Sequence, residues 1–151
     1  MTHHTIRSFV LANFALAAVA ALPLGACAQS AFDPVQPVVL PEASLDFQNI
    51  NPMVTMAAAY GDRSAGAHGT FGRFPANFIT PMHTHTGAYH GIVIKGVMTN
   101  PFKGEVTIPE MVPGSYWYVP AGAVHATACI SDEPCEFYFH AESVFDFTPV
   151  E

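Results

Sequence analysis

Two short segments, residues 81–91 (PMHTHTGAYHG) and 114–125 (GSYWYVPAGAVH), carry the most informative pattern in the chain. Alternate side chains of a β-strand share a face, so His83 and His85 would project from the same side. Two imidazoles at this spacing can bind one transition-metal ion. His125 follows a Pro-x-Gly turn and can supply a third ligand. We therefore expect a metal site formed by these three histidines.

The second segment resembles the motif G-x5-P-x-G-x2-H-x3-N of the cupin superfamily, a family of small β-barrels. Its intervals match throughout, and only the final Asn differs, because Cys129 occupies that position. The matching residues are Gly114, Pro120, Gly122 and His125. The resemblance implies an all-β, cupin-type β-barrel of the double-stranded β-helix or jelly-roll kind.

The first segment is similar to the other cupin motif, G-x5-H-x-H-x3/4-E-x6-G. It matches at His83, His85 and Gly96, with Asn77 in place of the leading Gly. Asn also tolerates the left-handed backbone conformation that such a Gly adopts. With both motifs present, the resemblance covers nearly the whole domain predicted over residues 53–151. It implies a divalent transition metal, whether Fe, Mn, Ni, Cu or Zn.

The Glu of this motif is missing, and Tyr89 stands at its interval from Gly96. Strand alternation favours an inward Tyr89 and an outward His90, whereas a β-bulge or a longer interval would turn His90 inward. Both are candidate catalytic residues. Tyr89 would be neutral and suited to donate a hydrogen bond to a bound molecule. It can equally be a core aromatic that packs against Trp117 or Phe137.

Short strand-like runs separated by Gly and Pro predict the all-β class independently of the motifs. The predicted strands are 54–60, 69–74, 77–85, 89–99, 105–108, 115–119, 123–130, 135–140 and 145–147. Aromatic residues fall on both faces of several of these runs. This pattern indicates either packing between sheets or a homodimer through the outer face, and the resemblance also points to dimers. His68 and His140 are interpreted as a loop residue and as a bystander at a strand end.

The first 28 residues read as a signal peptide, because a short Ala-rich apolar run follows Arg7. A retained hydrophobic helix is the alternative. The segment ends in LGAC, residues 24–27, which resembles a lipoprotein cleavage box with Cys27 as the lipidation candidate. The overlapping stretch 26–28 also fits an ordinary cleavage site. Residues 29–52 are Pro-rich and read as a linker or N-terminal arm. We expect an exported, periplasmic protein whose only membrane contact is the signal peptide or a lipid anchor.

Two cysteines, Cys129 and Cys135, lie in the predicted domain. In an oxidising compartment they are a candidate disulfide across a turn. A metal-ligating or free thiol at Cys129 is the alternative.

The charge balance excludes a nucleic-acid-binding protein, because 5 Lys and Arg stand against 12 Asp and Glu without a basic cluster. The expected function is to bind or transform a small molecule inside the barrel, and metal-dependent oxygenation or isomerisation is the chemistry expected of an enzyme with this site. A non-catalytic ligand-binding or sensor protein, with or without metal, is the alternative. The fold alone does not choose between them.

Overall fold

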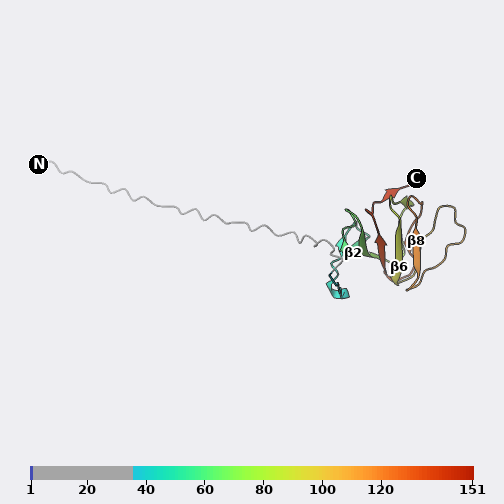
Figure 1. Cartoon of the computed structure of the whole chain (residues 1–151), viewed down its shortest axis with the longest axis horizontal. Coiled ribbons are helices and arrows are strands. Elements are labelled where there is room, and N and C mark those ends of the chain that lie inside the picture. Colours follow the sequence, from blue (N-terminus) through green and yellow to red (C-terminus); the bar gives the residue numbers. More distant parts are fainter. Residues whose placement is uncertain (2–35) are drawn as a thin grey trace.

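A computed structural model describes Met1 and residues 36–151 (Figure 1). The predicted signal peptide beyond Met1, the lipidation candidate Cys27 and the first part of the predicted linker lie outside the described residues. Within the described part, no helix is long and apolar enough to cross a membrane.

The described residues form short and medium β-strands with one 3₁₀ turn. The elements are η1 (Glu42–Ser44), β1 (Gln48–Asn49), β2 (Thr55–Gly61), β3 (His68–Phe74), β4 (Phe78–Ile79), β5 (His83–Thr84), β6 (Tyr89–Lys95), β7 (Met98–Thr99), β8 (Tyr116–Val119), β9 (Ala128–Cys129), β10 (Cys135–Ala141) and β11 (Thr148–Pro149).

The strands make one large sheet and two smaller ones, with antiparallel pairing throughout the described part. The large sheet has the order β1-β2-β3-β10-β6-β8, and Figure 1 shows β2, β6 and β8 running across it. The smaller sheets are β4-β9-β7 and β11-β5. Strands distant in sequence are neighbours, as in a jelly roll. The predicted all-β class is confirmed.

The core lies on one face of the large sheet, because buried and less buried residues alternate along its strands. In β10, Cys135, Phe137, Phe139 and Ala141 are buried and the residues between them are partly exposed. Strand β6 alternates in the same way from Tyr89 onward. This period of two fixes which side chains reach the interior.

The motif positions that the sequence assigned to turns have a left-handed backbone. Their φ angles are 55° for Asn77, 80° for Gly96, 90° for Gly114 and 72° for Gly122. Among the described residues, Asn77 is the only non-glycine with positive φ. The expectation that Asn replaces the motif Gly for its backbone conformation is confirmed.

Two predicted strands are wrong. Residues 105–108 are exposed and pair with no strand. Their alternating apolar side chains therefore do not pack against a sheet. Residues 145–147 are not a strand, because Phe145 and Phe147 pack on the histidines, and β11 begins only at Thr148.

Other predicted strands are shorter or divided. The runs 77–85 and 89–99 are each broken into two strands, and 123–130 retains only β9 and an isolated bridge at His125. Conversely, β1 lies inside the predicted linker and pairs with β2, so the sheet starts before residue 53.

Candidate metal centre

The backbone brings His83 and His125 directly opposite each other. The amide of His83 donates to the carbonyl of His125 at 2.8 Å, and the amide of His125 donates back at 3.0 Å. Two residues further on, the carbonyl of His85 accepts a hydrogen bond from Gly122 at 2.9 Å. The Pro-x-Gly turn thus aligns the second motif with the first.

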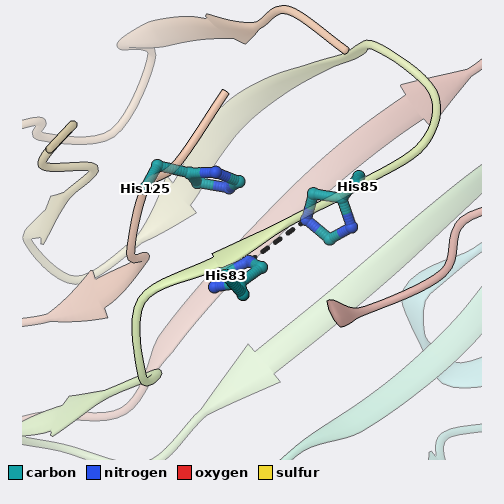
Figure 2. A group of neighbouring side chains, drawn as sticks. All are labelled: His83, His85 and His125. Carbon is teal, nitrogen blue, oxygen red and sulfur yellow. Dashed lines mark hydrogen bonds between the residues drawn. The ribbon is translucent and has the colours of Figure 1, made fainter. Parts of the chain in front are cut away.

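The three imidazole rings converge from these two segments (Figure 2). One nitrogen of each ring lies within 4.8 Å of the others. His83 and His85 are 3% exposed and His125 is fully buried. The structure therefore brings together all three of the ligands predicted from the sequence.

Each ring has one nitrogen fixed by a backbone carbonyl. Nδ1 of His83 donates to the carbonyl oxygen of Pro81 at 2.8 Å. Nδ1 of His125 donates to the carbonyl oxygen of Ala123 at 3.0 Å, and Nδ1 of His85 donates to that of Asp146. A carbonyl oxygen only accepts, so each Nδ1 carries the proton and each Nε2 presents a lone pair. Histidine ligands of metals are commonly oriented in this way.

The two adjacent Nε2 atoms provide a test of whether a metal ion fits. Nε2 of His83 and Nε2 of His85 are 3.1 Å apart. With both Nδ1 protonated, neither Nε2 can donate to the other, and two lone pairs at this distance repel. A cation bound by both would remove the repulsion, and two nitrogens about 2.1 Å from one ion and roughly at right angles have this separation. The donor set fits a divalent transition metal.

Burial keeps the imidazoles neutral. Desolvation lowers the pKa of His83 and of His85 to about 4, and it also lowers the pKa of His125. Metal ligation needs the unprotonated ring. All three rings are thus in the form that binds metal at neutral pH.

Tyr89 and His90 have opposite positions, as strand alternation favours. Tyr89 is 3% exposed, and its hydroxyl donates to Nε2 of His125 at 3.1 Å. Burial raises the pKa of Tyr89 to about 12, so the phenol is neutral. His90 is exposed on the outer face, where its Nδ1 contacts the Tyr116 hydroxyl at 2.6 Å. The structure adds Tyr89 to the site and does not bring His90 to it.

The sequence analysis missed the role of residues 145–147. Phe147 stacks on His83 and Phe145 stacks on His85, each with ring centroids 4.1 Å apart. Between them, the Asp146 carboxylate accepts hydrogen bonds from the Thr86 amide at 2.7 Å and hydroxyl at 2.6 Å. The Phe-x-Phe spacing was a usable signal, because it places both rings on one side, as in His-x-His.

Other candidates from the sequence lie outside the centre. Cys129 forms a disulfide with Cys135, so it offers no thiolate to a metal. His68, interpreted from the sequence as a loop residue, begins β3 and is fully buried, with Nδ1 2.8 Å from the Thr70 hydroxyl. His140 contacts the hydroxyl of Tyr60 at 2.6 Å.

A cavity of about 400 Å³ adjoins the histidines, with His83 and His85 in its wall. Most of its lining is apolar and aromatic. Its aromatic lining residues are Phe74, Phe78, Tyr89, Trp117, Phe137, Phe139, Phe145 and Phe147. Arg63 is the one residue with a permanent charge among those that line it. This size is typical of small-molecule sites.

Solved structures similar to this chain are cupins, at low sequence identity. The polyketide cyclase RemF from Streptomyces resistomycificus matches with a TM-score of 0.64 and 18% identity over 77% of this chain and 87% of that chain. An RmlC-like cupin from Shewanella frigidimarina matches with a TM-score of 0.59 and 13% identity, over 72% of this chain and 92% of that chain. Salicylate 1,2-dioxygenase from Pseudoaminobacter salicylatoxidans matches with a TM-score of 0.52 and 15% identity, over 62% of this chain and 26% of that chain. These likenesses establish the fold and not the activity.

No curated protein matches the chain. One family model matches residues 48–151, and its description is "Domain of unknown function (DUF4437)". The match includes both histidine segments and the β1 strand. This chain, a cupin in fold, therefore belongs to the DUF4437 family.

Proposed function

We propose that this protein is an exported metal-dependent cupin enzyme that transforms a small molecule by oxygenation or isomerisation. The observation that carries the proposal is the convergence of three neutral imidazoles, each with an unprotonated Nε2, beside an aromatic cavity. The centre lies at the cavity wall, where a bound molecule can reach it.

A divalent metal bound by His83, His85 and His125 would act as a Lewis acid or activate oxygen. The chain itself orients the ligand rings through three carbonyls, and it shields them from water with Phe145 and Phe147. The Tyr89 hydroxyl donates to Nε2 of His125 in the metal-free protein. If that nitrogen bound the metal instead, the hydroxyl, with its proton retained, would be free to donate a hydrogen bond to a bound oxygen atom. These are positioning and electrostatic contributions.

The missing carboxylate has a direct electrostatic effect. Three neutral imidazoles leave the charge of a divalent ion uncompensated, so the centre favours a ligand with a negatively charged oxygen. Tyr89 stands in the motif position of the Glu, and its high pKa prevents it from replacing that charge in the metal-free state.

Elemental analysis of the purified protein tests the metal centre. Wild type is expected to contain close to one transition-metal ion per chain, and His83→Ala and His125→Ala to contain none. His90→Ala is the matched control, because it removes an exposed histidine that lies in the same sequence motif, between His85 and Gly96. Equal metal content in all four proteins would refute the centre. Oxygen consumption or substrate isomerisation by wild type alone would support an enzyme.

One observation favours the alternative, a non-catalytic ligand-binding or sensor protein. No carboxylate is present among the residues that line the cavity, and Tyr89 with a pKa of about 12 is a poor general base. A co-purifying organic ligand, together with no turnover by the metal-loaded protein, would favour this alternative.

Export is supported by the Cys129–Cys135 disulfide, since disulfides persist in oxidising compartments. Fractionation of cells and mass spectrometry of the mature N-terminus would test export, the cleavage position and lipidation at Cys27. Exclusively cytoplasmic protein with an intact N-terminus would contradict the proposal.

The proposed homodimer is supported by exposed apolar side chains on neighbouring strands of the outer face. They are Ile92 and Ile94 of β6 and Tyr116 and Tyr118 of β8. One such face can meet its own copy across a two-fold axis. Light scattering should give a dimer for wild type and a monomer for Ile92→Glu, and a monomeric wild type would refute it.

A further inference from the structure

We propose that the cavity binds a small aromatic monocarboxylate, with the ring among the aromatic side chains and the carboxylate at Arg63. This inference rests on the proposed function for its use of the cavity beside the metal centre. It goes further by naming the substrate class.

The aromatic lining of the cavity favours a ligand with a flat, apolar ring. Eight aromatic side chains line a volume of about 400 Å³. Several of these rings already meet edge to face: Phe74 with Phe137 at 5.0 Å, and Tyr89 with Phe145 at 5.2 Å. A planar ring can enter such an arrangement and gain both apolar burial and edge-to-face contacts. A single benzene ring with one or two substituents is well within the volume.

The charge of the cavity selects a single anion. Arg63 is the one permanently charged residue in the lining, and it is half-buried. The ion pairs in the described part of the chain involve Arg73 and His140, not Arg63. The neighbouring Asp62 carboxylate accepts hydrogen bonds from the Ser64 amide at 2.8 Å and the Ser64 hydroxyl at 2.6 Å. The charge of Arg63 contributes to lowering the pKa of Asp62, but no ion pair joins the two side chains. The guanidinium therefore has its forked donors available, and a carboxylate is the group that matches them.

A second, independent donor is present in the same wall. Trp117 is 6% exposed, and its buried indole N–H has no hydrogen-bond partner of good geometry. The indole N–H lies toward the Tyr89 hydroxyl and lowers the pKa of Tyr89 against the larger effect of burial, but it makes no hydrogen bond of good geometry there. A buried donor without an acceptor costs free energy, and a ligand oxygen would satisfy it. The lining thus offers donors from Arg63 and Trp117, and it offers no carboxylate.

The backbone keeps Arg63 next to the metal centre. Its carbonyl accepts a hydrogen bond from the amide of Phe145 at 2.8 Å, and the Phe145 ring stacks on His85. Arg63, His83 and His85 line one cavity, so a molecule held at Arg63 would lie in the same enclosure as the two histidines.

Fluorescence of Trp117 provides the test, because it is the only tryptophan in the chain and it lines the cavity. Metal-free and metal-loaded protein would each be titrated with benzoate, neutral benzamide and cationic benzylamine. We expect saturable binding of benzoate, binding of benzamide at least ten-fold weaker, and no binding of benzylamine.

Variants assign the effect to one side chain. Arg63→Gln should weaken the binding of benzoate at least ten-fold and leave the binding of benzamide unchanged. In Arg63→Lys, part of the lost affinity for benzoate should be restored. Arg73→Gln is the matched control, because Arg73 is paired with Glu136 at 2.6 Å and does not line the cavity. It should bind benzoate as wild type does.

Three results would overturn the inference: equal affinity for benzoate and benzamide, an Arg63→Gln variant that binds benzoate as wild type does, or benzoate binding that depends on metal and not on Arg63. Arg63-dependent benzoate binding to a protein that takes up no metal would support the ligand class while refuting the metal-dependent function. The two proposals thus fail in different measurements.

Discussion

Lowering the pH from 7.0 to 5.5 should leave the metal affinity of this protein almost unchanged. An imidazole with an ordinary pKa of about 6.5 is mostly protonated at pH 5.5, which weakens metal binding about ten-fold for each ligand and about 100-fold for two. Burial lowers the pKa of His83 and of His85 to about 4. At pH 5.5 only about 3% of each ring is then protonated. Proton competition begins only as the pH approaches 4.

Equilibrium dialysis against a low, fixed concentration of Ni²⁺ or Zn²⁺, followed by elemental analysis, would measure this affinity at each pH. Trp117 fluorescence would report whether the protein remains folded. His90→Ala should follow wild type, because that exposed ring is remote from the three ligands. A loss of ten-fold or more between pH 7.0 and 5.5 in folded protein would refute the argument that burial keeps these imidazoles neutral.

Three further predictions concern stability. Burial lowers the pKa of His68 to about 4, so below pH 6.5 the unfolded chain binds a proton at this residue that the folded chain does not. His68 alone should therefore lower the free energy of unfolding by up to roughly 3 kcal/mol between pH 6.5 and 4, in addition to the effects of His83 and His85. Urea titrations should show a smaller pH dependence of the unfolding free energy in His68→Gln than in wild type. Reducing the Cys129–Cys135 disulfide, whose sequence separation is 6, should lower the free energy of unfolding by about 2 kcal/mol. A variant with both cysteines replaced by Ser is the control, and reductant should not change its stability. Gly91→Ala should destabilise by about 1–3 kcal/mol, because the added Cβ collides with the Trp117 ring; an unchanged thermal midpoint would contradict this contact.

Much of the site was predictable because it depends on local periodicity and on turns of fixed length. The His83 and His85 spacing sets a shared face, and the Pro-x-Gly turn sets the distance to His125. The same alternation correctly assigned Tyr89 to the interior and His90 to the exterior, since β6 begins without a bulge at that point.

What the sequence did not reveal depends on contacts between distant segments. The ring stacking of Phe145 and Phe147 on the histidines arises from packing across some 60 residues, for which no local pattern gives a distance. Arg63 reads as an ordinary loop residue until its carbonyl is seen to bind Phe145. The predicted strand at 105–108 failed for the converse reason, because alternation creates a strand only where a neighbour is present.

The hydrogen bond from His85 Nδ1 to the carbonyl of Asp146 makes the choice of coordinating atom depend on tertiary structure. In an unfolded chain both nitrogens of His85 are open to a metal ion, so nothing selects between Nδ1 and Nε2. Once the segment around Asp146 has docked, only Nε2 remains accessible, and its direction is fixed by a residue 61 positions away. Which nitrogen of His85 can bind an ion is then a property of the folded tertiary structure.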